Sequence, residues 1–125
     1  MLDHIGFTVA NYSKSREFYV KALATLGYGI DMEFQMGEGS HAGFGTPGKP
    51  AFWISSAGNA LQNRLHVAFA AKSRAEVDAF YHAAIAAGGK DNGPPGQRPH
   101  YHPNYYGAFV IDPDGHNVEA VCHAP

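Results

Sequence analysis

The first residues of the chain alternate between apolar and polar in the manner of a half-buried strand. Ile5, Phe7 and Val9 fall on one face of an extended segment, and His4 falls on the other. The side chain of His4 is therefore predicted to point away from the apolar face.

A helix is predicted next. Its apolar stripe consists of Tyr19, Ala22, Leu23 and Leu26, which recur at three- and four-residue spacing. Asn11 or Ser13 is suited to cap its start, and Gly27 is suited to end it. Three short apolar runs follow, at 30–36, 42–45 and 51–55, separated by turn residues. The order is strand, helix and three strands, or βαβββ.

The second half of the chain repeats the first. When His4 is laid on His66, the segment after it matches in character, Phe18-Tyr19 falls on Phe80-Tyr81, and Gly27 falls on Gly89. Matches at a strand start, in mid-helix and at a helix end indicate a duplicated unit. Within the repeat, Ser73 and Glu76 form a capping box ahead of the second helix.

The last part of the second unit holds two clear strands, at 106–111 and 117–122, joined by a turn at 112–115. The third strand of this unit is hard to see, and the Gly- and Pro-rich segment 91–99 is interpreted as a loop at the rim of the site. The prediction is an α+β fold. One domain, residues 1–125, consists of two tandem βαβββ modules (about 1–58 and about 63–125) in a curled mixed sheet around a metal-binding cleft.

Composition limits the classes of function. The chain has 125 residues, of which 45% are hydrophobic and 16% charged, and this suits one core. A net charge of −2 without basic runs argues against nucleic acid as a partner. The sequence has no signal-peptide pattern and no long apolar run, and its lone cysteine, Cys122, has no partner for a disulfide. We therefore expect a cytoplasmic protein that is not bound to a membrane.

The chain contains an unusually large number of histidines, eight in all. His4 and His66 occupy matched positions in the two units, and alternation along the last strand places Glu119 opposite its apolar side. Two imidazoles and one carboxylate suit a divalent metal with open coordination positions for substrate. Other histidines are expected to be solvated: His41 and His116 in turns, His82 on a helix and His123 at the terminus.

Three stretches carry a resemblance to a known family. They are Asp-His-Ile at the first strand with a downstream Ser-Arg-x-Phe-Tyr, then Leu-His-Val-Ala-Phe, and then Phe-Val-Ile-Asp-Pro-Asp-Gly-His-Asn-Val-Glu. The chain resembles the vicinal-oxygen-chelate superfamily over essentially its whole length. That superfamily includes glyoxalase I, bleomycin-resistance proteins and extradiol dioxygenases. The resemblance implies that His4, His66 and Glu119 are metal ligands.

One departure from the family pattern bears on the reaction. Glyoxalase I-like members have a fourth ligand, a carboxylate on the last strand of the first module, but Phe52 stands there and no Asp or Glu occurs in residues 44–64. Two histidines and one carboxylate instead resemble extradiol dioxygenases, which use iron(II), and fosfomycin-resistance thiol transferases, which use manganese. Against ring cleavage, Phe109 stands where extradiol enzymes have a tyrosine.

Candidate residues for chemistry gather before the next-to-last strand. His100, His102 and Tyr105 are candidate acid–base residues, and Arg98 suits an anionic group of a substrate. Tyr106 completes this rim. Phe52 and Trp53 are candidates for an apolar wall of the substrate site, although a role in the core is the stronger expectation for both.

The expected function is that of a divalent-metal-dependent enzyme acting on a small metabolite chelated through adjacent oxygens. Iron(II) or manganese is favoured, with zinc and nickel as alternatives. Ring-cleaving dioxygenase-like chemistry ranks slightly above glyoxalase- or epimerase-like proton transfer. The alternative from another class is a metal-free binding protein of the bleomycin-resistance type. A homodimer with twofold symmetry is expected, and the sequence leaves open whether modules are exchanged between chains.

Overall fold

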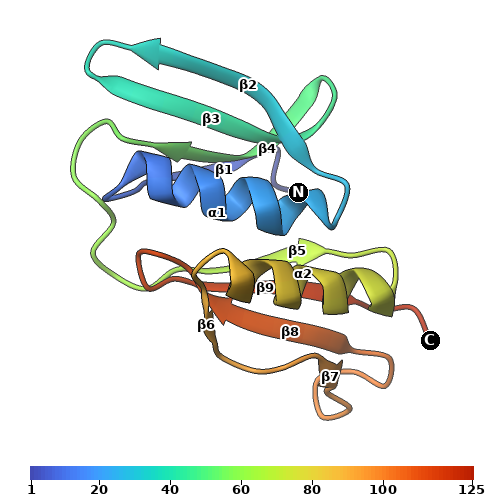
Figure 1. Ribbon diagram of the computed structural model, residues 1–125. Coiled ribbons are helices and arrows are strands. Elements are labelled where there is room, and N and C mark those ends of the chain that lie inside the picture. The colour runs from blue at the N-terminus through green and yellow to red at the C-terminus, as the bar shows by residue number, and fades with distance from the viewer.

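The computed structural model describes all residues 1–125, and two similar units follow one another along the chain (Figure 1). Module 1 contains β1 (Ile5–Thr8), α1 (Tyr12–Ala24), β2 (Gly29–Met36), β3 (Gly39–Thr46) and β4 (Lys49–Ser55). Module 2 contains β5 (His66–Ala70), α2 (Arg74–Ala86), β6 (Lys90–Asp91), β7 (Gly96–Gln97), β8 (Tyr106–Ile111) and β9 (Asn117–Cys122). The predicted α+β class and the paired modules are confirmed.

The helix ends follow the predicted capping chemistry. Asn11 caps α1 and accepts a hydrogen bond from the backbone N–H of Lys14. Ser73 caps α2 by accepting from the N–H of Glu76, whose carboxylate accepts from the N–H of Lys72 at 2.7 Å. Gly27 has a φ of +82°, a conformation that side chains with a Cβ disfavour, which explains a glycine where the chain leaves α1.

The strands form two mixed sheets. The order is β1-β4-β3-β2 in module 1 and β5-β9-β8-β6 in module 2, where β7 also pairs with β8. The segment 91–99 is therefore more than a loop. Its ends pair with β8 as two short strands, because the Gly and Pro residues between them interrupt a single edge strand.

Both sheets place one face on a common core. This core of 19 buried residues draws on both modules, and the ring of Phe52 in module 1 lies 5.1 Å from that of Phe69 in module 2. Helices α1 and α2 pack together, whereas β1 and β5 make no contact. Since the core lies on the helix side of each sheet, the other faces of the two sheets, here called the open faces, look away from it.

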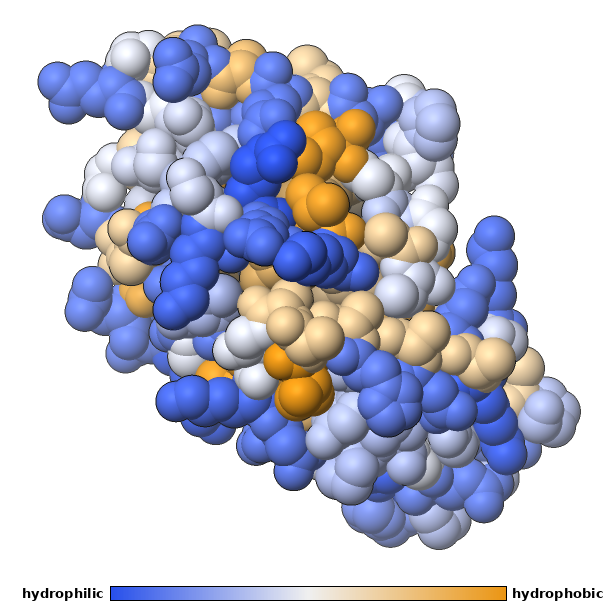
Figure 2. Space-filling model, in the orientation of Figure 1, coloured by the Kyte–Doolittle hydropathy of each residue, from blue (hydrophilic) through white to orange (hydrophobic).

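Hydrophilic residues cover most of the surface seen in Figure 2, and a band of apolar residues crosses its middle. None of the helices has the length and apolar character needed to span a membrane.

Candidate functional site

The open face of module 2 holds a buried carboxylate. Glu119 in β9 is 1% exposed, and its Oε1 lies 2.8 Å from Nε2 of His66 in β5. The hydroxyl of Tyr105 donates a hydrogen bond to the other carboxylate oxygen. The lack of a side chain at Gly107 leaves space for this cluster, because a Cβ there would lie 3.2 Å from Glu119 Oε2. The predicted ligands His66 and Glu119 and the predicted catalytic residue Tyr105 thus lie together.

The protonation of Tyr105 follows from these contacts. Burial, and then the hydrogen bond and the negative charge of Glu119, raise the pKa of the Tyr105 phenol well above its usual range. The phenol therefore stays protonated and acts as a hydrogen-bond donor at neutral pH. No Lys or Arg forms an ion pair with Glu119.

The open face of module 1 carries the third predicted ligand. His4 lies just before β1 with 60% of its side chain exposed, and its Nδ1 is 2.6 Å from a carboxylate oxygen of Asp3. His4 shares a shallow pocket with Phe34, His41 and Trp53. The imidazole of His41 stacks on Phe34, with ring centroids 5.1 Å apart.

A single chain does not assemble the complete predicted metal site. Nowhere do three His, Cys, Asp or Glu side chains come together in a way that would hold an ion. His66 and Glu119 fit two positions of one coordination shell, in which donor atoms lie about 3 Å apart. The residues of one chain therefore fit a divalent ion only in part, because His4 belongs to the other open face.

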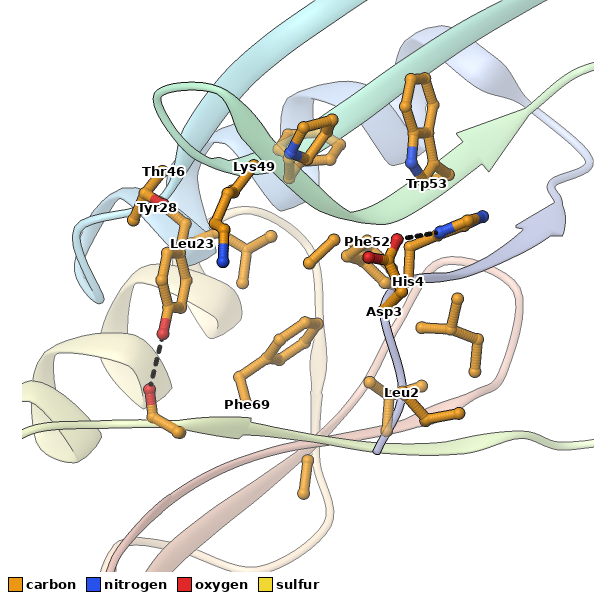
Figure 3. A pocket seen from close by; sticks show the side chains of 18 of the residues that line it. Leu2, Asp3, His4, Leu23, Tyr28, Thr46, Lys49, Phe52, Trp53 and Phe69 are labelled. Atoms are coloured by element: carbon orange, nitrogen blue, oxygen red, sulfur yellow. Dashed lines mark hydrogen bonds and ion pairs between the residues drawn. The ribbon is translucent and has the colours of Figure 1, made fainter.

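A cleft of about 900 Å³ lies between the two modules (Figure 3). Both His4 and His66 line it, as do the predicted wall residues Phe52 and Trp53, but Glu119 does not. Phe52 is 4% exposed and packs in the core, whereas Trp53 lies on the open face of module 1.

The remaining predicted rim residues, Arg98, His100, His102 and Tyr106, do not form one cluster. Arg98 lies on the open face of module 2, with its guanidinium 5.6 Å from the ring centre of Phe109, and it donates to the carbonyl of Pro94. His100 packs against Tyr101, and neither His100 nor His102 hydrogen-bonds to the Glu119 cluster. Tyr106 is on the helix side of β8, where its hydroxyl donates to Asp78 of α2 at 2.7 Å.

Two of the histidines that were expected to be solvated in turns are instead at least half-buried. His116 is 1% exposed, because its ring packs under Phe7 of module 1 and its Nδ1 accepts the N–H of Leu65. His41 lies within β3 and is half-buried on Phe34. The alternation of Phe34 and His41 along their strands was the sequence signal for this stack, but their pairing required the hairpin register.

Comparison with known proteins identifies the family. The family model described as the Glyoxalase/Bleomycin resistance protein/Dioxygenase superfamily matches residues 1–120. The chain belongs to this superfamily. No curated protein matches the chain.

Several solved structures share the superfamily fold. A glyoxalase/bleomycin resistance protein from Albidiferax ferrireducens T118 is 29% identical, with a TM-score of 0.80 and 98% of each chain covered. A superfamily enzyme from Burkholderia phytofirmans PsJN is 18% identical, with a TM-score of 0.70 and 98% of each chain covered. Glyoxalase I from Zea mays is 22% identical with a TM-score of 0.73; 97% of this chain aligns with 45% of that one. The chain thus spans about half the length of the maize enzyme, and the two similarities below 25% identity show the fold alone.

Proposed function

We propose that the chain is a divalent-metal-dependent enzyme of this superfamily that works as a homodimer. His66 and Glu119 of one copy would hold the ion together with His4 of a second copy. The observation that carries the proposal is the carboxylate of Glu119, which is 1% exposed and has an imidazole and a phenol, but no Lys or Arg, as partners. A buried carboxylate is costly without a compensating cation.

A second copy is needed to complete the metal site because the two open faces of one chain point away from its shared core. Twofold pairing lays the module 1 face of each copy on the module 2 face of the other and so closes two equivalent sites. Two imidazoles and one carboxylate leave coordination positions free, which favours iron(II) or manganese, with zinc and nickel as the alternatives. Such an ion acts as a Lewis acid on a substrate with adjacent oxygens.

Metal content tests the ligand set. After anaerobic loading with iron(II) or manganese and removal of the excess, we expect about one ion per chain in the wild type and at least tenfold less in His66→Ala and Glu119→Gln. His82→Ala removes an exposed histidine of α2 and serves as the matched control. Equal metal content in His66→Ala and the wild type would refute the site.

Co-expression tests the sharing of the site between copies. A chain with His4→Ala and a chain with Glu119→Gln, carrying different tags, are purified as the mixed dimer. Sharing between copies predicts one intact site per mixed dimer and none in either parent dimer. If each chain forms its own site, the mixed dimer binds no more metal than its parents.

For the reaction, we propose ring-cleaving oxygenation of a catechol-like substrate. Phe109 pairs with Glu119 across the strands but has no hydroxyl. The phenol of Tyr105, which donates a hydrogen bond to Glu119, supplies that hydroxyl instead. The iron-loaded dimer is tested with a catechol panel for oxygen uptake and with hemithioacetal for thioester formation. Oxygen uptake with a yellow product supports ring cleavage, and thioester formation without oxygen contradicts it.

A further inference from the structure

The cleft between the modules has an apolar floor. Leu23, Phe52 and Phe69, which the core holds in place, form its base, and 12 of the 20 residues that line it are hydrophobic. Its volume of about 900 Å³ lies within the range of small-molecule sites. The cleft is thus large and apolar enough for a ligand with a substantial hydrocarbon or aromatic body.

Lys49 is the one Lys or Arg residue that lines the cleft. It takes part in no ion pair, and its side chain runs into the cleft beside Leu23 (Figure 3). The phenol of Tyr28 lies at the same end, held by a hydrogen bond of 3.3 Å to the carbonyl of Ala70. The ammonium of Lys49 next to an apolar floor offers hydrogen-bond donors to an anion, whereas the one hydrogen of the Tyr28 hydroxyl is donated to Ala70.

The opposite charge is confined to the far end of the cleft. Asp3 is the one acidic residue in the lining, and its carboxylate is 2.6 Å from His4 Nδ1. In Figure 3, this pair is separated from Lys49 by the cleft. Lys49 therefore lacks a carboxylate of the protein itself.

We propose that the cleft binds an amphipathic monoanion. The carboxylate of the ligand accepts hydrogen bonds from Lys49, and its apolar body lies on Leu23, Phe52 and Phe69. Burial of apolar surface supplies the affinity, and the charge-assisted hydrogen bond to Lys49 selects the anion over a neutral molecule of the same length. His4 and His66 also line this cleft, but Glu119 and Tyr105 do not, and Lys49 lies at the end of the cleft away from His4 (Figure 3).

Calorimetry with metal-free protein tests the selection. The probes are decanoate below its micelle concentration and decan-1-ol, which has the same chain length without the charge. We expect decanoate to bind about five- to tenfold more tightly than decanol. Lys49→Met should remove this difference, Lys49→Arg should keep most of it, and Lys90→Met in β6 should leave it unchanged.

Three results would overturn the proposal: no binding of either probe, equal affinity for both in the wild type, or a preference for decanoate that survives in folded Lys49→Met protein. If Lys49→Met does not fold, loss of the preference in Lys49→Gln decides instead. Glu119→Gln separates this site from the metal site. It should lose the metal and keep the preference for decanoate. Each of the two proposals can therefore be refuted independently of the other.

Discussion

At the scale of single residues, glycines shape the open face of module 1. Gly6 and Gly43 flank Trp53 across neighbouring strands. A Cβ on Gly43 would lie 2.7 Å from the indole of Trp53, and one on Gly6 would lie 2.9 Å from the Trp53 Cβ. The indole rests against the sheet because these positions carry no side chain.

Gly43→Ala is therefore expected to lower the free energy of unfolding by about 1–3 kcal/mol, because the indole must move from its place on the sheet. Urea denaturation followed by Trp53 fluorescence measures the change. Gly29→Ala in β2 is the matched control, since an added Cβ there meets nothing within 4 Å. Equal stability of the two variants would contradict the steric role of Gly43 beneath the Trp53 indole.

At the scale of elements, a buried hydrogen bond ties module 1 to module 2. The hydroxyl of Tyr19 in α1 donates to Asp112, in the turn between β8 and β9, at 2.5 Å. The other carboxylate oxygen of Asp112 accepts the backbone N–H groups of Asp114 and His116. Burial, and then the charge of Asp112, raise the pKa of Tyr19 well above its usual range, so this phenol remains a donor.

Tyr19→Phe should destabilise the fold by about 1–3 kcal/mol, because the Asp112 oxygen stays buried without its partner. Thermal and urea unfolding measure the loss. Tyr106→Phe serves as the comparison, since its partner Asp78 is reached by water and a smaller loss is expected. A loss in Tyr19→Phe no greater than in Tyr106→Phe would count against the role of this bond.

The contact of α1 with β2 is expected to depend on pH. Hydrogen bonds from Arg16 and Tyr12 lower the pKa of Glu33 below its usual 4.5, against the opposing effect of burial. A lowered carboxyl pKa in the folded state adds stability above pH 4.5, and this contribution disappears as pH falls through the folded-state value.

The variant Glu33→Gln should accordingly lose about 0.5–1 kcal/mol at pH 7, a value kept small because the pair is partly exposed to solvent. The difference from the wild type should shrink as the pH falls below 4.5. Urea titrations between pH 3 and 7 measure it, with Glu38→Gln in the β2–β3 turn as a charge-matched control. A difference that is constant over this range would disprove the linkage.

At the scale of the whole molecule, the open face of module 1 is apolar beyond its pocket. Met32 and Met36 of β2 are 48% and 68% exposed on the same face as Phe34 and Trp53. A second copy laid on this face would bury them, as the proposed homodimer requires. Met32→Lys is then expected to weaken dimerisation at least tenfold, because it places a charge in the contact.

Sedimentation over a range of concentrations measures this shift towards monomer. Val20→Lys on α1, outside the open face, is the control and should leave the dimer intact. A concentration-independent monomer mass for the wild type would contradict the homodimer.

The sequence by itself determined most of the elements and their faces, but not the short strands β6 and β7. The apolar stripes of both helices, the caps Asn11 and Ser73, and the strands 106–111 and 117–122 are set by contacts between residues near in sequence, so local patterns predict them. Alternation along β9 placed Glu119 opposite the helix side. The matched histidines marked the two equivalent strands.

Tertiary structure alone decided which faces meet. The helix sides of both sheets form a common core, so that His4 and Glu119 lie on the open faces of different modules, and no local pattern encodes the relative placement of two modules. The contact of Tyr105 with Glu119 depends on the pairing of β8 with β9 within module 2, whereas the burial of His116 under Phe7 and the cleft beside Lys49 arise between the two modules. Their side chains meet because the core packs both modules together, and that packing depends on the summed shape of many side chains.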